Sequence, residues 1–293
     1  MFGDAGHAVS EAELTVATLN LENGRELELL PDLAGQVPDM DILLFQEARA
    51  FDFEGQERRF RAEELLAPLG LDRSVLTRSS RGLLHEMMFL RSSRLHPVAH
   101  FTSDLPDVFH DQIGWVRVRV RGLEPVLHVR SVQWAHWNGD VRLDEAQKLT
   151  RYAAPGVAAV IGGDFNSLWP DCPGHEPEFE PDWQVLPPHK QHHKTLPPGL
   201  RPDGLLVSDR RALTVLAGAG FRSAGCLAAD TTVTVNAGID HGQGARIDHL
   251  ILSPLLSAAF VPGSYRVWVN DLGDRASDHR LVSARFDLGR LDG

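Results

Sequence analysis

A short apolar stretch followed by two glycines and two polar side chains constrains this chain most strongly. Residues 157–161 read Val-Ala-Ala-Val-Ile, which is typical of a strand buried on both faces. Gly162 and Gly163 come next and predict a close approach of the backbone to another part of the molecule. Asp164 and Asn166 follow, and residues two apart on an extended segment point to the same side. The stretch therefore predicts a buried strand that delivers a carboxylate and a carboxamide to one site.

This stretch has two interpretations. An ordinary turn after the strand is one of them, because Gly, Asp and Asn all favour turns. A functional site is the other, because a carboxylate beside a carboxamide suits a hard cation, or a water that must be oriented and deprotonated. The rest of the chain has to decide between the two.

The composition excludes several classes of protein. With 293 residues, 43% of them hydrophobic and 24% charged, the chain resembles a globular protein that buries a substantial core. No apolar run approaches the roughly 20 residues that cross a bilayer, so no membrane span is expected. The net charge of −11 disfavours a broad, sequence-independent grip on nucleic acid. The same acidity suits an enzyme that gathers carboxylates around a divalent metal.

The cysteines and the N-terminus bear on the compartment. Cys172 and Cys226 are the only cysteines and stand in no CxxC pattern, so no disulfide framework is expected. The first residues lack the basic segment and the apolar core of a signal peptide. We expect a cytoplasmic protein, and secretion by a leaderless or trimmed route stays open.

Apolar runs recur along the chain and predict strands with helices between them. Strands are expected at residues 14–19, 41–45, 73–77, 87–90, 98–101, 114–120, 125–132, 157–161, 247–252, 265–269 and 281–286. Helices are expected at 25–36, 58–69, 142–154 and 208–219. The Pro- and His-rich stretch of about 169–203 lacks periodicity and predicts a long surface loop. No repeat or linker divides the chain, so one domain over residues 1–293 is expected, with its core at about 14–287.

Polar side chains lie at or beside the ends of many of these strands. They are Asn20, Glu47, Asp164 with Asn166, Asp248, and Asp278 with His279. Any one of them is compatible with a solvated position on the rim of a sheet. Because strand ends on one edge of packed sheets lie close together, the whole set predicts a common site.

Five short segments carry these residues in a recognisable order. They are Leu19-Asn20-Leu21, Phe45-Gln46-Glu47, Gly163-Asp164-Phe165-Asn166, Ile247-Asp248-His249 and Ser277-Asp278-His279. This order resembles the endonuclease/exonuclease/phosphatase superfamily, the fold of deoxyribonuclease I, over about residues 14–287. The resemblance implies an α+β fold, a four-layer α/β/β/α sandwich of two packed mixed β-sheets flanked by helices. It also implies a phosphoesterase that uses Mg²⁺ or Mn²⁺.

The same resemblance implies which residues hold the metal. Glu47 is expected to bind it directly, with Asn20 beside it and Asp278 on the metal side. Mg²⁺ keeps several of its waters and takes only one or two carboxylates, so a sparse all-oxygen site suits it.

The remaining residues are expected to act on the water and the phosphate. By the resemblance, Asp164 positions or deprotonates the attacking water with help from Asn166. Asp248 holds His279, which contacts the phosphoryl oxygens. A histidine paired with an aspartate stays cationic near neutral pH, which suits this contact.

One position departs from the family pattern. The strand before the helix near Arg142 usually ends in a His that contacts the scissile phosphate, and Gln133 stands there in this chain. Gln can donate a hydrogen bond but carries no positive charge. Of the nearby histidines, His128 lies inside the strand, and His136 would need the loop to fold back. Gln133 therefore predicts altered substrate choice or weakened hydrolysis.

Three functions remain open at this point. A hydrolase of a small phosphorylated substrate is preferred, because Trp134, Trp137 and Trp169 are expected on loops beside the site, where they could line a pocket. Packing of these tryptophans against the rim is the alternative. A DNA or RNA nuclease is the second function. A degenerate member that binds a phosphorylated ligand without turnover is the third, and Gln133 is its only support.

Three other groups of residues are expected to lie outside the site. Asp240-His241 repeats an Asp-His pair but sits in a glycine-rich loop, so Asp248 is preferred. His189, His192 and His193 are expected on a surface loop rather than at a zinc ion. The basic residues 58–61 are surrounded by glutamates and are expected to pair with them.

Overall fold

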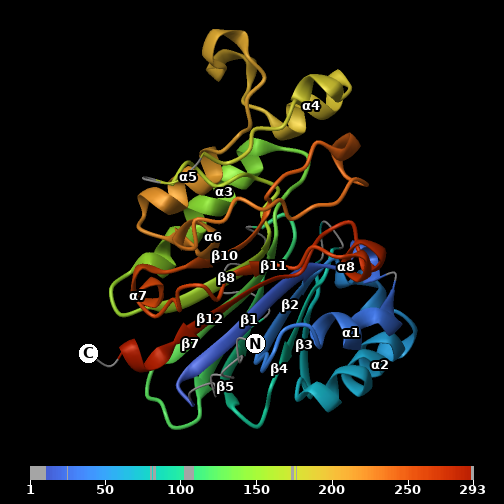
Figure 1. Ribbon diagram of the computed structural model, residues 1–293, viewed down its shortest axis with the longest axis vertical. Helices are drawn as coiled ribbons and strands as arrows, with labels where there is room; N and C mark the ends of the chain where they lie inside the picture. Colours follow the sequence, from blue (N-terminus) through green and yellow to red (C-terminus); the bar gives the residue numbers. More distant parts are fainter. Residues whose placement is uncertain are drawn as a thin grey trace, which may run out of the picture.

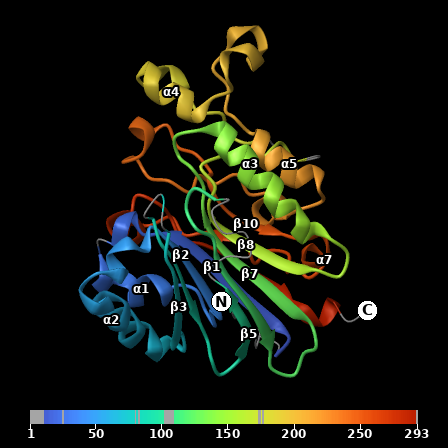
Figure 2. The same ribbon diagram turned by 180° about the vertical axis from the view of Figure 1, so that it is seen from behind.

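Two six-stranded β-sheets lie face to face at the centre of the molecule, and helices cover their outer faces (Figures 1 and 2). The computed structural model describes residues 11–291 except 25, 80, 82–83, 102–108, 173–174 and 176. The parallel pairs β1–β2 and β7–β8 stand among antiparallel neighbours, so both sheets are mixed. The expected four-layer α/β/β/α sandwich is confirmed.

The strands of the first sheet run in the order β11-β12-β1-β2-β4-β3. Their bounds are β1 Glu13–Asn20, β2 Ile42–Gln46, β3 Arg73–Thr77, β4 Glu86–Leu90, β11 Arg266–Val267 and β12 Val282–Asp287. The second sheet runs in the order β5-β6-β7-β8-β10-β9. Its strands are β5 Leu95–Phe101, β6 Gly114–Val120, β7 Val126–Gln133, β8 Ala158–Asp164, β9 Arg222–Ser223 and β10 Asp248–Leu252.

The helices divide between the two sheets. The first sheet is covered by α1 (Leu30–Ala34), α2 (Glu57–Leu66) and α8 (Asp271–Ala276). The second is covered by α3 (Gly139–Leu149) and α5 (Arg211–Gly218), with α6 (Ala224–Leu227) and α7 (Pro254–Ser257) beside β10. The helix α4 (Pro188–Lys194) and the chain after it extend beyond one end of the sandwich (Figures 1 and 2). Within the described ranges, none of the helices has the length and apolar character needed to cross a membrane.

Alternation along the strands produces the apolar layers. On β1, Leu14 and Val16 belong to the cluster between the two sheets, where they meet residues such as Val160 of β8. Ala17 and Leu19 lie among the residues that pack under α1 and α2. A third cluster fills the space between the second sheet and α3 and α5. A period of two therefore gives each central strand two buried faces.

The two glycines of β8 stand where a side chain would not fit. A Cβ atom on Gly162 would lie 2.6 Å from Cδ1 of Leu44 in the opposite sheet. Gly163 has a φ of 151°, and a Cβ atom there would lie 1.9 Å from the carbonyl oxygen of Val132 on β7. The predicted close approach is confirmed, and the glycines continue the strand to Asp164 instead of ending it.

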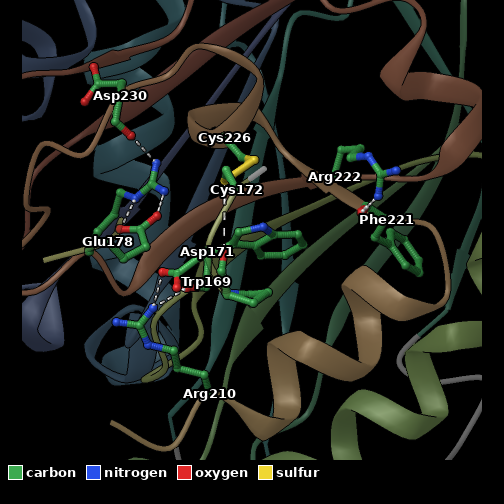
Figure 3. The surroundings of a disulfide bond; sticks show 11 residues. Trp169, Asp171, Cys172, Glu178, Arg210, Phe221, Arg222, Cys226 and Asp230 are labelled. Atoms are coloured by element: carbon green, nitrogen blue, oxygen red, sulfur yellow. Dashed lines mark hydrogen bonds and ion pairs between the residues drawn. A yellow bond between two sulfur atoms is a disulfide. The ribbon is translucent and has the colours of Figure 1, made fainter. Parts of the chain in front are cut away.

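The stretch at 169–203 differs from the expected surface loop. Its first part is tied to the sandwich, because the buried carboxylate of Glu178 forms an ion pair with the buried guanidinium of Arg246 (Figure 3). Cys172 and Cys226 form a disulfide with Cα atoms 5.8 Å apart, so the expectation of no disulfide was wrong. The two cysteines are 54 residues apart and meet only because the stretch folds back on α6, which spacing alone does not reveal. Residues 187–207, which include α4, project from the end of the sandwich and are called the arm below.

The disulfide should stabilise the fold. Closing a loop of 54 residues reduces the entropy of the unfolded chain and is expected to contribute about 4 kcal/mol. Replacing both Cys172 and Cys226 with Ala should lower the free energy of unfolding by up to this amount, as measured by urea unfolding. Dithiothreitol should have the same effect on the wild type and none on the double variant. Equal urea midpoints for the oxidised and reduced wild type would contradict the expectation.

Candidate active site

Strand register brings the predicted site residues to one edge of the sandwich. In the second sheet, Asp164 of β8 pairs with Gln133 of β7 on one side and with Asp248 of β10 on the other. In the first sheet, Asn20 at the end of β1 pairs with the last residue of β2, and Glu47 follows directly. The strand ends therefore meet, as the sequence predicts.

Asn20 joins the two sheets at this edge. It is fully buried, and its Nδ2 lies 3.1 Å from Oε1 of Glu47 and 3.2 Å from both Oε1 of Gln133 and Oδ2 of Asp164. Its Oδ1 accepts a hydrogen bond from the backbone N–H of Glu22, which fixes the orientation of the amide. The nitrogen of the amide thus faces the carboxylates. That Asn20 helps to hold a metal stays a prediction. Its observed contact with the expected metal ligands is the hydrogen bond to Glu47.

Asp164 accepts hydrogen bonds from several amides. Its Oδ2 accepts from Asn20, from Nε2 of Gln133 at 3.0 Å and from Nδ2 of Asn166 at 3.1 Å. Its Oδ1 accepts from the backbone N–H of Asn166 at 2.8 Å. The Asn166 amide also donates to the carbonyl of Trp134, and Asn166 has a φ of 47°, a left-handed conformation that Asn tolerates. Since Oδ1 accepts one hydrogen bond from the described residues, it retains a lone pair for a water.

His279 is held by Asp248. Its Nδ1 lies 2.9 and 3.0 Å from the two carboxylate oxygens of Asp248. Thr234 donates a further hydrogen bond of 2.6 Å to the same carboxylate. The other ring nitrogen, Nε2, lies 3.8 Å from Oδ2 of Asp164 and 4.0 Å from Oδ1 of Asp278. One edge of the imidazole is therefore fixed, and the other faces Asp164 and Asp278.

The electrostatics of this pair favour the charged forms. Burial lowers the pKa of His279, but Asp248, followed by Asp164 and Asp278, outweighs burial and raises the pKa to about 10. Burial raises the pKa of Asp248 to about 6 although His279 acts against it. Between these two values the pair consists of a carboxylate and an imidazolium.

Carboxyl groups also influence one another in this site. Burial raises the pKa of Glu47, and Asp164 and Asp278 raise it further, against the effects of Asn20 and His279. Burial also raises the pKa of Asp278. Glu47 has a φ of 56°, which is a left-handed backbone conformation that is strained for a residue with a long side chain. Residues with such strained conformations cluster at functional sites. A divalent cation with oxygen ligands would relieve this repulsion, so the residues present fit Mg²⁺ or Mn²⁺.

A second placement of a metal is less favourable. Ligand atoms of Asp164, Asp248 and His279 lie within 4.8 Å of one another, the one group of its kind in the described part of the chain. A metal there would have to replace the proton that Asp248 and His279 share, and the pKa of His279 is raised rather than lowered. The oxygens around Glu47 therefore suit a hard cation better.

Two of the three tryptophans do not line a pocket. Trp134 is 1% exposed and Trp169 is 2% exposed, and their rings lie against Phe165 and His249. The alternative of packing against the rim was correct for both of them. Trp137 is 39% exposed, and its indole N–H lies 3.4 Å from Nε2 of His110. The preference for a small phosphorylated substrate therefore loses most of its support from the tryptophans.

Two residues near the site were not identified from the sequence. Thr234 holds Asp248 from a segment without strand periodicity, which offers no signal. Glu86 begins β4, is fully buried and accepts a hydrogen bond from the hydroxyl of Ser131. Burial raises its pKa well above its ordinary value, and Glu47 and Asp164 add to the effect. Its position at the start of an apolar run was the available signal.

In the described part of the chain, the residues that were expected to lie outside the site make no side-chain contact with Glu47, Asp164 or His279. Asp240 pairs with Lys194 at 3.0 Å, not with a site histidine. The three histidines His189, His192 and His193 lie on the helix α4 rather than on a loop, and they are not part of the candidate metal group. The basic cluster at 58–61 pairs with neighbouring glutamates, as expected.

One family of known sequences matches most of this chain. A sequence model described as "Endonuclease/Exonuclease/phosphatase family" matches residues 17–279. No curated protein sequence matches the chain significantly.

Solved structures share the fold along nearly the whole chain. The 3′ phosphatase NExo from Neisseria, bound to a product DNA hairpin, is 20% identical with a TM-score of 0.58, covering 94% of this chain and 99% of that one. An AP endonuclease from Archaeoglobus fulgidus is 19% identical with a TM-score of 0.61, covering 94% and 99%. TDP2 from C. elegans is 16% identical with a TM-score of 0.57, covering 97% and 78%. At these identities the likeness shows the fold.

The raised pKa of His279 predicts a stability that depends on pH. The folded protein holds the imidazole proton up to about pH 10, whereas an unfolded histidine releases it near pH 6.5. The contribution of His279 protonation to the free energy of unfolding is therefore complete below about pH 6.5, and it is lost as the pH rises toward 10. Between pH 7 and 9 the free energy of unfolding of the wild type should fall by up to about 1.4 kcal/mol per pH unit relative to that of Asp248→Asn. In this variant His279 lacks its main partner. Urea unfolding in EDTA measures this, and parallel stability curves would refute it.

Proposed function

This chain belongs to the endonuclease/exonuclease/phosphatase family, and we propose that it hydrolyses phosphoesters with a divalent cation at the site described above. The observation that carries the proposal is that Asp164 and Asp278, which raise the pKa of Glu47, meet the Asp248–His279 ion pair, with Nε2 of His279 4.0 Å from Asp278. A phosphoester is anionic and repels nucleophiles. Its hydrolysis therefore needs neutralisation of charge and a water held in line.

The metal side consists of Glu47 and Asp278, with Asn20 behind Glu47. Glu47 is the direct ligand in this proposal, because Asp164 and Asp278 raise the pKa of its carboxyl group and because Asn20 holds it. Asp278 is partly exposed and can contribute through a bound water. A bound Mg²⁺ or Mn²⁺ supplies positive charge against the phosphoryl oxygens.

The other side acts on the water and the phosphate. Asp164 orients the water through the free lone pair of Oδ1 and accepts its proton, and Asn166 holds Asp164 in place. The imidazolium of His279 donates from Nε2 to a phosphoryl oxygen, while Asp248 keeps the ring oriented and charged.

Gln133 lacks the charge of the usual histidine but keeps a hydrogen-bonded connection. Its side-chain oxygen accepts from Asn20, and its Nε2 donates to Asp164. This arrangement supports a positioning role for Gln133 and favours turnover over binding alone. The unfavoured alternative, a member that binds a phosphorylated ligand without hydrolysis, rests only on the missing charge.

The compartment is a separate proposal. Disulfides persist in oxidising compartments and are rare in the cytosol. The Cys172–Cys226 disulfide therefore favours an oxidising compartment over the expected cytoplasmic location.

The experiment that tests this function measures hydrolysis of bis(4-nitrophenyl) phosphate with Mg²⁺, with Mn²⁺ and with EDTA. Turnover should require the metal, and Asp164→Asn should lower kcat by about 100-fold or more, the scale of a lost general base. Asp287→Asn is the matched control, because Asp287 pairs with Glu13 at the far end of β1 from Asn20. Full activity in EDTA, or in a folded Asp164→Asn variant, would rule out this mechanism.

The metal assignment is tested by replacing Glu47 with Gln. The variant loses the charge of the proposed direct ligand, so its affinity for Mg²⁺ should fall at least about tenfold, with calorimetry as the readout. Asp248→Asn removes a member of the competing Asp164–Asp248–His279 group and should change the affinity less. If Asp248→Asn has the larger effect, the cation lies at the competing group.

A further inference from the structure

Basic side chains gather beside the hydrolytic centre although the whole chain carries a charge of −11. The backbone N–H of Trp134 donates to the carbonyl of Asp164 at 2.9 Å, and Asn166 donates to the carbonyl of Trp134. These bonds hold the loop after β7 against the site. His136 lies two residues further along this loop and is exposed. A histidine therefore stands at the surface next to the reacting centre.

One buried guanidinium holds this loop and the arm together. Arg142 of α3 donates from Nη1 to the carbonyl of Ala135 and from Nη2 to the carbonyl of His193, both at 2.9 Å. Ala135 precedes His136, and His193 lies in the last turn of α4. The end of α4 is thus fixed beside the loop that carries His136.

Two further contacts fix the root of the arm to the site. The Lys194 ammonium lies 3.0 Å from the carboxylate of Asp240, in the segment that leads to β10. The carbonyl of Lys194 accepts from the N–H of Asp209, and the carbonyl of Asp209 accepts from the hydroxyl of Ser167 at 2.9 Å. Ser167 follows Asn166 directly. The end of α4 is therefore a built part of the site's rim.

Lys194 pairs with Asp240 at this rim, whereas His136 and His193 form no ion pair with a carboxylate in the described part of the chain. Partial desolvation of its ring, followed by Lys194, lowers the pKa of His136, and Asp164 acts in the opposite direction. Desolvation and Lys194 also lower the pKa of His193. Among the carboxylates near this cluster, Asp164 belongs to the reacting centre, Asp240 pairs with Lys194, and Asp209 pairs with Arg211. A bound anion would favour the charged forms of the histidines.

We propose that His136, His193 and Lys194 form a second anion subsite, which binds a phosphate group of the substrate other than the one that is hydrolysed. The inference rests on the proposed function, because the subsite lies beside the centre that holds the scissile phosphate. Two imidazoles and an ammonium supply the N–H donors that phosphate oxygens accept. The phosphate is either the next one along a nucleic-acid strand or the second phosphate of a small ester.

Residues on the outer surface of α4 can distinguish a nucleic-acid strand from a small ester. Lys190 and His192 are exposed there, beyond the subsite. A strand long enough to leave the subsite would pass along them, whereas a small ester would end at the subsite. Lys190→Gln should therefore weaken binding of a long strand and leave a small bisphosphate unaffected.

The test compares substrates with and without the additional phosphate. The dinucleotide TpT carries one phosphate and pTpT carries two, so the ratio of their KM values isolates the subsite. We expect a lower KM for pTpT in the wild type, and His136→Asn and His193→Asn should each reduce the preference about tenfold, the effect of losing one charge-assisted hydrogen bond. The matched control is His96→Asn. His96 is exposed and lies far from the site. Its strand partner is Arg119, and the partner of Arg119 is Val126, which begins β7, whereas Gln133 ends it.

Oligothymidylate and fructose 1,6-bisphosphate identify the source. Weaker oligothymidylate binding in Lys190→Gln, with a steep dependence on salt between roughly 50 and 200 mM, indicates a nucleic-acid strand. A preference for the bisphosphate that is independent of Lys190 indicates a small ester. Either result supports the subsite. Equal changes in KM for TpT and pTpT, or a loss of preference in His96→Asn as well, would overturn it.

A measurement without turnover separates the two proposals. Pyrophosphate should bind the wild type in EDTA and shift the His136 and His193 signals in NMR, and the two Asn variants should lose this binding. Intact pyrophosphate binding in a protein that hydrolyses no phosphoester would contradict the proposed function alone. Hydrolysis without any preference for pTpT and without pyrophosphate binding would contradict the subsite alone.

Discussion

The hydrogen bonds of the Asn20 amide connect the two halves of the site across the sandwich. The amide reaches Glu47 at the end of a strand in the first sheet and Asp164 at the end of a strand in the second. The separation of the proposed metal side from the water side therefore depends on how closely the two sheets pack. Gly162 permits this packing, because any side chain there would collide with Leu44 in the opposite sheet. The geometry of the site is thus a property of the whole sandwich, and no single loop sets it.

The site contains carboxylates around Glu47 and an imidazolium at His279. Burial and the neighbouring carboxylates raise the pKa of Glu47. A bound cation would lower this pKa. Across the site, the buried Asp248–His279 pair keeps an imidazolium next to the space for the phosphate. In the proposed subsite, the imidazole donors of His136 and His193 extend outward to the end of α4, although desolvation and Lys194 lower the pKa of both rings. A metal ion together with a phosphorylated ligand is complementary to this pattern, since the cation meets the carboxylates and the anion meets the imidazoles.

Much of the fold and the set of converging residues could be predicted from the sequence. Buried strands have a strong period-two or continuous apolar signal, and polar residues such as Asp164 and Asp248 stand out at their ends. The remaining features depend on contacts between irregular segments distant in sequence. The Cys172–Cys226 disulfide, the hold of Thr234 on Asp248 and the position of α4 are of this kind. The pocket-lining role considered for Trp134 fails for the same reason, because the burial of Trp134 depends on how the loop after β7 folds back onto Phe165.

The central claim is that the cation binds at the carboxylates around Glu47 and leaves the Asp248–His279 pair to the phosphate. Anomalous diffraction at the manganese edge, from crystals soaked in Mn²⁺, tests this most directly. We predict one anomalous peak next to the Glu47 carboxylate, with the hydrogen bonds between Asp248 and His279 intact. A peak among Asp164, Asp248 and His279, with that pair broken, would contradict the account.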